Sequence, residues 1–381
     1  MIHFNKKKYF LPVQKCVIII YMVCIIKHCF ILWNFFSQED LMNQKYDVIS
    51  LGEVLLRLSA PVNGRLAQGD TLMKHVGGAE LNVASVLGML GLNSAVVSKV
   101  PDNLLASYVR NILREAKVSE EYLVEDTSAD SRLGLYYYEY GSYPRKPRVV
   151  YDRKNSSINK IEWNDVPSSM FENARLFHTS GITLGLGGNA REFAIQCIRE
   201  FKKQGALISF DVNYRSNLWT GEEARTCIES ILPYVDIFFC SADTARLTFG
   251  KTGTTEEIQK SFCKDYPISV VASTERTVLT PKKHNFTSVI YSAKTDSYYR
   301  EEPYNNLDVV DRIGSGDSYV AGALYGYLKY GDCQKALEYG NAMAAIKHSL
   351  IGDMAFTDLA EIDDIISQHQ NTSGYQAEMK R

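Results

Sequence analysis

The chain has 381 residues, of which 45% are hydrophobic and 23% charged, and its formal net charge is −2. This composition is ordinary for a globular protein, and the length allows one large α/β domain with a small appendage. A near-neutral charge provides no basic field, which argues against nucleic acid as the principal partner.

The first 41 residues are the anomalous part of the chain. Lys6-Lys7-Lys8 precede an apolar run from Cys16 to Ile26, and a basic flank before an apolar core suggests a signal peptide. No small-x-small cleavage site follows, however, and Lys27 interrupts a membrane-spanning helix. Met42 stands just before the first predicted strand, so we interpret residues 1–41 as translated upstream sequence, with a signal or membrane anchor as the alternative.

Residues 42–369 are predicted to form the α/β domain, and the polar tail 370–381 is expected to fray. The β-rich run Tyr46–Leu58 predicts a buried strand that continues into a more polar one. A turn-rich excursion follows, and Gly77-Gly78 then open a predicted helix over Ala79–Leu90. The next predicted elements are a strand over Ser94–Val100, a helix over Leu104–Glu115 and a tyrosine-rich hairpin of Leu133–Tyr140 with Arg148–Arg153.

From Ala174 onward, short strands alternate with helices. Such alternation favours a parallel sheet that helices cover on both faces. The predicted strands are Leu176–Thr179, Ala206–Phe210, Asp236–Cys240 and Ser269–Ala272, followed by an antiparallel pair, Phe286–Ser292 and Ser297–Tyr299. The predicted helices are Ala190–Gln204, Glu222–Ile231, Thr255–Lys264 and Gln334–Leu350.

A glycine turn near the C-terminus carries the strongest chemical signal. A β-rich run reaches Val310, and Gly314-Ser315-Gly316-Asp317 then leads into a helical apolar pattern. Such a turn places backbone N–H groups and the positive end of a helix dipole at one point, which binds anions and above all phosphates. Asp317 is suited to take a proton from a hydroxyl that attacks phosphorus. The motif alone is equally compatible with a plain turn in which Asp317 is a helix-start residue.

Two motifs resemble the ribokinase (PfkB) family of carbohydrate kinases, over residues 45–369. DRIGSGDSYVAGALYGYL is similar to the family's C-terminal signature, and GGAELNVA at 77–84 is similar to its N-terminal glycine pair. The resemblance implies a ribokinase-like three-layer αβα sandwich with a mostly parallel sheet. It also implies a small β-sheet lid from residues about 57–76 and 131–155, and a homo-oligomer formed through that lid. The implied cofactors are ATP and Mg²⁺, with a monovalent cation such as K⁺ as a further candidate.

The substrate side of such a site has to recognise hydroxyls. Gly78 brings backbone close to a sugar and Asn82 can bond its hydroxyls, although Asn82 is also explained as a polar residue satisfied within its helix. Arg215 follows the carboxyl end of a predicted strand, where α/β proteins bind ligands, and Arg153 lies two residues from Tyr151 on one face of another. Two arginines suit a carboxylate clamp better than a neutral sugar, although each alone reads as a surface ion-pair residue.

Within the family, several segments resemble 2-keto-3-deoxygluconate kinases: Gly-Leu-Tyr at 134–136, Tyr151-x-Arg153, Asp-Val-Asn-Tyr-Arg at 211–215, and Gly352-Asp353. The resemblance implies that the keto-deoxy acid binds to Gly78, Tyr136, Tyr151, Arg153 and Arg215, and that Asp317 is the base. The expected reaction is ATP-dependent phosphorylation of 2-keto-3-deoxygluconate to its 6-phosphate. A fructokinase or another sugar kinase is the alternative, and a non-catalytic family member that binds a sugar acid is the alternative of another class.

The phosphate side shows two departures from the family pattern. We expect the amides of Gly314, Ser315 and Gly316 to form the anion hole, while Asp311 either holds a cation or only shapes the turn. The nucleotide-binding residues that the resemblance implies are Ser241, Ser273, Gly314, Gly316 and Asn341. However, Ser241-Ala242-Asp243-Thr244 replaces an Asn-x-x-Glu element, and residues 273–277 lack the glycines of a Thr-x-Gly-x-x-Gly turn. Both departures affect how Mg²⁺ and ATP are handled.

The eight cysteines form neither a CxxC pair nor a zinc spacing. A disulfide framework is improbable in a chain of this size, so reduced thiols are the better interpretation. We therefore expect a cytoplasmic protein, with the signal or membrane anchor of residues 1–41 as the minor alternative.

Overall fold

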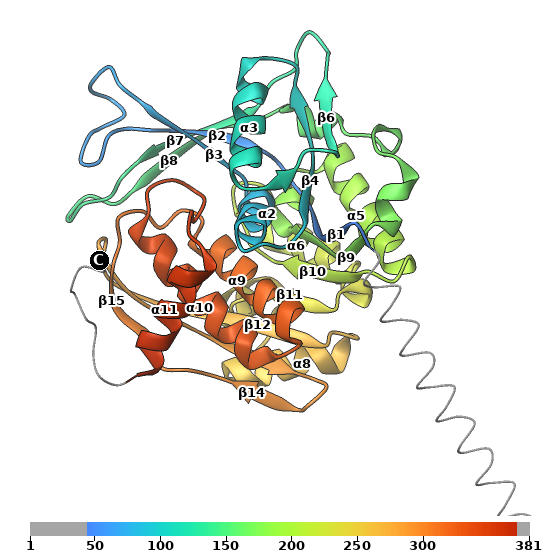
Figure 1. The fold of residues 1–381 in the computed structure, drawn as a ribbon, viewed down its shortest axis with the longest axis vertical. Helices are drawn as coiled ribbons and strands as arrows, with labels where there is room; N and C mark the ends of the chain where they lie inside the picture. The colour runs from blue at the N-terminus through green and yellow to red at the C-terminus, as the bar shows by residue number, and fades with distance from the viewer. Residues whose placement is uncertain (1–43, 372–381) are drawn as a thin grey trace, which may run out of the picture. The chain divides into compact units, whose positions relative to one another are not determined.

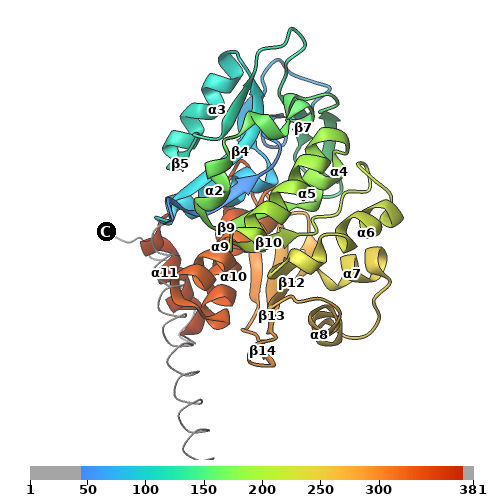
Figure 2. The ribbon, with the colours of Figure 1, turned by 90° about the vertical axis from the view of Figure 1, so that its right-hand side faces the viewer.

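The computed structural model describes residues 44–371, and the predictions for residues 1–41 and for the tail beyond 371 lie outside the described residues. Residues 45–371 form one compact unit with a large sheet and a small one. Helices cover both faces of the large sheet (Figure 1, Figure 2). The predicted α/β class with a mostly parallel sheet is therefore confirmed.

The large sheet has the strand order β14-β13-β12-β11-β10-β9-β1-β4-β5. Pairing is parallel from β5 to β12, and β13 then pairs antiparallel with both β12 and β14. β6 adds to β4 in parallel and β15 adds to β13 antiparallel. The strand bounds are β1 Tyr46–Leu51, β4 Ser94–Pro101, β5 Val118–Ser119, β6 Leu123–Asp126, β9 Ala174–Ser180, β10 Leu207–Asp211, β11 Ile237–Phe239, β12 Val270–Thr280, β13 Lys283–Ser292, β14 Ser297–Tyr299 and β15 Tyr304–Asp308.

Two hydrophobic cores lie on opposite faces of this sheet. Neighbouring strand residues point to opposite faces, so Leu176 of β9 joins one core and Phe177 joins the other. The core of Leu176 includes residues of α2 (Ala79–Met89), α9 (Ser315–Tyr330), α10 (Cys333–Ser349) and α11 (Leu359–Gln370). The core of Phe177 includes residues of α4 (Gly181–Gly185), α5 (Gly188–Lys203), α6 (Gly221–Glu229), α7 (Ala242–Phe249) and α8 (Thr255–Asp265).

The helix α3 (Leu104–Glu115) packs with α2 and β4 in a smaller core. Its N-cap Asn103 accepts the N–H groups of Leu105 and Ala106, which satisfies two donors that the helix leaves unpaired. Four short 3₁₀-helices complete the described chain: Ser157–Lys160, Trp163–Asp165, Ser168–Glu172 and Leu232–Tyr234. None of the helices between residues 44 and 371 has the length and hydropathy that a membrane span requires.

The small sheet, which we call the lid sheet, consists of β2 (Leu55–Ser59), β3 (Met73–Gly77), β7 (Gly134–Glu139) and β8 (Arg148–Asp152). Its strand order is β3-β2-β7-β8, with β2 and β7 parallel and both outer pairs antiparallel. The residues expected to form a small separate sheet therefore do so. Figure 1 shows it extending away from the helices of the main domain.

Most predicted elements appear within a few residues of their expected bounds, but β12 is longer than predicted. It continues beyond Ala272 to Thr280 as an antiparallel hairpin with β13. The residues from Glu275 onward are exposed and mostly polar, so their sequence lacks the apolar pattern of a buried strand. The prediction also lacked the short helix α7 and the helix α11.

Candidate active site

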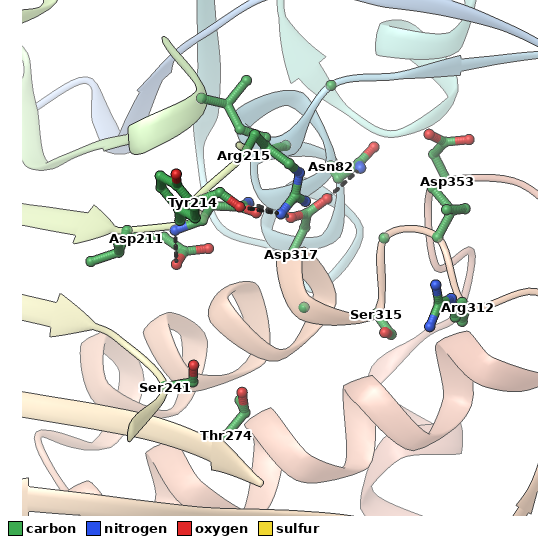
Figure 3. Close-up of a pocket in the computed structure, with 18 of the residues that line it drawn as sticks. Asn82, Asp211, Tyr214, Arg215, Ser241, Thr274, Arg312, Ser315, Asp317 and Asp353 are labelled. Carbon is green, nitrogen blue, oxygen red and sulfur yellow. Dashed lines mark hydrogen bonds between the residues drawn. The ribbon is translucent and has the colours of Figure 1, made fainter. Parts of the chain in front are cut away.

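A cavity of about 620 Å³ opens where β10, β11 and β12 run toward the glycine turn. Ligands of α/β proteins bind at the carboxyl ends of parallel strands, and this cavity has that position. Figure 3 shows Asn82, Arg215 and Asp317 in its upper part and Ser241 and Thr274 in its lower part. The lid sheet supplies Tyr136, Val149 and Tyr151 to the lining.

The glycine turn has the backbone that an anion hole requires. Gly314 is the N-cap of α9 and has φ +82°, in the left-handed region that favours glycine. A Cβ at this position would lie 1.9 Å from the carbonyl oxygen of Asp353, so no other residue fits there. A Cβ at Gly316 would meet no atom within 4 Å, which leaves open space above the first N–H groups of the helix. Ser315 N–H already donates to the carbonyl of Arg312 at 3.2 Å, so the turn offers the N–H groups of Gly314 and Gly316, together with a positive helix end, to the cavity.

Asp317 is held by two amides from other parts of the chain. Asn82 of α2 donates from Nδ2 to Asp317 Oδ2 at 2.7 Å, and Asn213 donates from Nδ2 to Oδ1 at 3.4 Å. Burial raises the pKa of Asp317 above its ordinary value, while the bond from Asn82 and the charge of Arg215 partly lower it. A fixed carboxylate with a raised pKa is a better proton acceptor than an exposed one. Asn82 is thus explained by its contact with Asp317 and not by a bond within its own helix.

The two arginines of the expected carboxylate clamp differ in their partners. Arg215 donates to the carbonyl of Tyr214 at 3.2 Å, and within residues 44–371 no carboxylate lies within ion-pair distance of it. Arg153 is buried and forms an ion pair with Glu53, which also accepts from Ser156. The charge of Arg153 is therefore balanced within the chain by Glu53, whereas that of Arg215 is not, and the clamp of two arginines stays a prediction. Its Nε is buried and has no hydrogen-bond partner.

The other expected substrate residues also line the cavity. Gly78 has φ +139°, and a Cβ there would lie 2.2 Å from the carbonyl oxygen of Glu53. Tyr136 is buried and donates from its hydroxyl to Asp353, whereas Tyr151 is 41% exposed at the mouth. The two tyrosine rings are 5.9 Å apart. Residues from the lid sheet, α2 and the loop after β10 thus meet around one space.

Two expected nucleotide-binding residues lie outside the cavity. Ser273 is buried and donates to the carbonyl of Cys240 at 2.7 Å, while its neighbour Thr274 lines the cavity. Alternate strand residues point to opposite faces, so the neighbour of the predicted residue is the one that lines the cavity. Asn341 is buried; its Oδ1 accepts from Ser288 Oγ at 2.8 Å and its Nδ2 donates to Glu301 Oε1 at 2.6 Å. Asn341 therefore supports the packing of α10. Ser241 does line the cavity and also caps α7 by accepting the N–H of Thr244.

The sequence pattern of the pfkB family carbohydrate kinases matches residues 45–358 of this chain. The chain belongs to this family. It is therefore a carbohydrate kinase, and the ribokinase-like fold that the two sequence motifs imply is confirmed.

Three relatives are informative about the kinase. It is 31% identical over 320 residues to a 2-dehydro-3-deoxygalactonokinase of Haloferax volcanii, which covers 84% of this chain and 96% of the relative. It is 28% identical over 341 residues to an ATP-dependent 6-phosphofructokinase of Thermoanaerobacterium thermosaccharolyticum, covering 89% and 98%. A crystal structure of a 2-dehydro-3-deoxygluconokinase from Thermotoga maritima superposes with a TM-score of 0.80 at 30% identity, covering 84% of this chain and 98% of that one.

Asp311 of the kinase does not line the cavity. Its carboxylate is buried, lies 2.6 Å from Arg57 and accepts the N–H groups of Ile313 and Gly352 at 3.0 and 3.2 Å. Of its two expected roles, the contacts favour shaping the turn, because a carboxylate with these partners has no side open to a metal ion. Within residues 44–371, no group of three or more histidine, cysteine or acidic side chains is arranged to hold a metal.

Mg²⁺ in kinases is held largely by phosphate and water oxygens with one or two carboxylates, so a dedicated protein cage is not required. Besides Asp317, the acidic side chains that line the cavity include Asp211 and Asp243. Burial and the charge of Asp317 raise the pKa of Asp211 to about 7. Asp243 is 91% exposed and pairs with Arg246 at 3.1 Å. These two residues fit a metal that arrives with the nucleotide.

Two arginines that the sequence analysis did not single out face the phosphate side. Arg276 of β12 and Arg312 of the turn both line the cavity, and no carboxylate within residues 44–371 lies within ion-pair distance of either. Partial desolvation and the charge of Arg312 lower the pKa of Arg276, although the residue as a whole is exposed. Two neighbouring guanidinium groups without a counter-charge suit a polyphosphate. A signal was present, because Arg312 stands inside the C-terminal motif and Arg276 stands where the expected glycine turn is missing.

Proposed function

We propose that this carbohydrate kinase transfers a phosphoryl group from ATP to the terminal hydroxyl of a 2-keto-3-deoxy sugar acid, with 2-keto-3-deoxygluconate as the leading substrate. The observation that carries the proposal is Arg215. It is a cation without a carboxylate partner in the described chain, and it lines the cavity beside the expected base, Asp317. A substrate carboxylate would neutralise this guanidinium group through a charge-assisted hydrogen bond. The Haloferax and Thermotoga relatives, which are named as kinases of 2-dehydro-3-deoxy sugar acids, support an acid substrate.

In the proposed reaction, Asp317 accepts the proton of the substrate hydroxyl as its oxygen forms a bond to the γ-phosphorus of ATP. The bond from that phosphorus to the β–γ bridging oxygen breaks, and ADP leaves. The N–H groups of the Gly314–Gly316 turn hold the oxygens of the moving phosphoryl group. Arg276 and Arg312 balance the charge of the remaining phosphates. When bound with ATP, Mg²⁺ supplies further neutralisation of that charge, with Asp211 and Asp243 as its candidate protein ligands.

A second candidate is a kinase of a neutral sugar or sugar phosphate, such as a fructokinase. The Thermoanaerobacterium relative favours it, because that protein is a 6-phosphofructokinase. The alternative of a non-catalytic family member has no support, since Asp317 and the glycine turn are both in place.

The experiment that separates the candidates is a substrate panel. Coupled ADP-release assays would compare 2-keto-3-deoxygluconate, its 4-epimer 2-keto-3-deoxygalactonate, fructose and fructose 6-phosphate. The proposal expects the two acids to have a kcat/KM at least about 10-fold above that of fructose, which corresponds to one charge-assisted hydrogen bond. A preference for fructose or its phosphate would replace the acid-sugar assignment with the second candidate.

The remaining cofactor expectation is a monovalent cation such as K⁺. Carbonyl oxygens beside the turn would suit one, but the buried ammonium of Lys347 donates to the carbonyls of Asp311 and Leu350 at 3.1 and 2.8 Å. We therefore propose that turnover does not require K⁺. Equal rates in potassium and tetramethylammonium buffers would support this, and a rate that rises severalfold with K⁺ would contradict it.

We further propose a cytoplasmic homo-oligomer that associates through the lid sheet. β8 is an edge strand whose five residues are all exposed, including Val149 and Val150. Exposed apolar edge strands readily pair with another chain. The cysteines described between residues 44 and 371 are free thiols, as a reducing compartment would allow. Light scattering of the protein and of Val150→Glu tests the association, because the variant should shift toward the monomer.

A further inference from the structure

A fully buried arginine of the lid sheet has no part in the reaction described above. Arg57 stands in β2, and its side chain is 0% exposed. It does not line the cavity, so a ligand is not its partner. Removing a guanidinium group from water is costly unless it is fully paired and hydrogen-bonded. The ion pairs and hydrogen bonds that offset this desolvation cost show which parts of the chain Arg57 connects.

Arg57 bridges two carboxylates that come from distant parts of the chain. Its Nη2 lies 2.6 Å from Asp311 Oδ2, and its Nη1 lies 3.1 Å from Asp353 Oδ1. On the lid side, its Nε donates to Ser59 Oγ at 2.7 Å, and its Nη2 donates to the hydroxyl of Tyr140 at 3.0 Å. One guanidinium group therefore connects the lid sheet to two segments of the main domain.

Both carboxylates belong to the segments that set the backbone of the glycine turn. Asp311 accepts the N–H of Ile313, which directly precedes Gly314, at 3.0 Å. It also accepts the N–H of Gly352 at 3.2 Å, which ties the two segments together. Asp353 packs its carbonyl against Gly314, and Figure 3 shows it beside the turn. The direction of the anion-hole N–H groups thus depends on where these two acids are held.

The lid residues that face the substrate are connected to the same acids. Tyr136, which lines the cavity, donates its hydroxyl to Asp353, and Tyr140 donates to Asp311 at 3.4 Å. Arg57 supplies the positive charge against which both carboxylates are stable in a buried site. If the lid sheet were displaced, the two acids would lose the guanidinium that bridges them, and Lys347 would be left as a cation beside them.

We propose that Arg57 is a positioning residue that couples the lid sheet to the anion hole. With the lid sheet in place over the substrate, Arg57 holds Asp311 and Asp353, and the turn presents its N–H groups to the phosphoryl group. Without it, substrate and ATP still bind, but the turn is misplaced for transfer. The proposal rests on kinase chemistry at the turn and not on which sugar is used.

The test compares Arg57→Met and Arg57→Lys with the parent enzyme. Methionine removes the charge, and lysine keeps it but cannot reach both carboxylates with a planar fork. We expect kcat to fall about 10²-fold in Arg57→Met and about 10-fold in Arg57→Lys, as misplacement of a catalytic group by about 1 Å would cause. KM for both substrates should change by less than about 3-fold. Added guanidinium ion should restore part of kcat in Arg57→Met and none in Arg57→Lys.

A matched control is Arg175→Met. Arg175 pairs with Asp47 at 2.6 Å, away from the turn, so its loss should leave kcat unchanged. If Arg57→Met does not fold, Arg57→Lys and Tyr140→Phe carry the test, because the latter removes only a hydroxyl that contacts Arg57 and Asp311. Parental kcat per folded molecule in the Arg57 variants would overturn the proposal. Because each variant is assayed with the sugar that the parent prefers, this result is independent of the substrate assignment.

Discussion

Asn82 Nδ2 lies 2.7 Å from Asp317 Oδ2, which joins the start of α2 to the start of α9 across 235 residues of sequence. The first residue belongs to the N-terminal glycine-pair motif and the second to the C-terminal signature. The two motifs therefore meet in one hydrogen bond at the expected base. This contact fixes the carboxylate while leaving it exposed to the cavity.

Replacing the base is the first prediction. Asp317→Asn keeps the shape of the side chain but cannot accept the proton, so kcat should fall at least about 10²-fold. The affinities for sugar and ATP, measured by calorimetry, should stay nearly unchanged. Asp130→Asn is the matched control, because that carboxylate is 79% exposed, pairs with Lys160 and does not line the cavity. Turnover of Asp317→Asn within a few-fold of the parent would make Asp317 a structural residue.

The two glycines of the turn should respond differently to alanine. Gly314→Ala places a Cβ in a left-handed conformation and 1.9 Å from a carbonyl oxygen, so it should lower the free energy of unfolding by at least about 1–3 kcal/mol. Gly316→Ala meets no atom within 4 Å, so the protein should keep its stability. Its methyl group would project into the space meant for the phosphoryl group, and kcat should fall. Urea unfolding and turnover of both variants check this, and equal stability of the two would contradict it.

Features formed by contiguous residues could be predicted from the sequence, whereas contacts between residues far apart in the chain could not. The Gly314–Asp317 turn is contiguous, so its spacing alone indicated an anion site. The ion pair of Arg153 with Glu53 joins residues 100 positions apart, and no local pattern reveals it. Ser273 and Thr274 differ only in which strand face they occupy, and a one-residue change of register exchanges them.

The arginine pair gives a prediction for the nucleotide. Arg276→Gln and Arg312→Gln should each raise KM for ATP by about 10-fold, since each removes a charge-assisted contact to phosphate. KM for the sugar should change little, because the two residues line the phosphate side of the cavity. Arg225→Gln is the control, an exposed arginine of α6 that pairs with Glu229 and does not line the cavity. An unchanged KM for ATP in both variants would exclude the proposed phosphate role.

Asp211 gives a prediction about pH. Its folded-state pKa is raised to about 7 by burial and by Asp317, so the folded protein binds this proton more tightly than the unfolded chain does. The charged form therefore costs stability, and the cost grows from about pH 4 to about pH 7. Asp211→Asn should be more stable than the parent at pH 8, with the gap shrinking toward pH 4. A difference in unfolding free energy that does not vary with pH would contradict this.

The measurement that tests the central claim most directly is the specificity of Arg215→Ala compared with that of the parent. Removing a charge-assisted bond to the substrate carboxylate should lower kcat/KM for 2-keto-3-deoxygluconate by about 10- to 150-fold. Fructose has no carboxylate, so kcat/KM for fructose should fall far less. The ratio of kcat/KM for the acid to kcat/KM for fructose should therefore decrease. If both substrates lose the same factor, Arg215 serves Asp317 or ATP and does not recognise the acid, and the sugar-acid assignment fails.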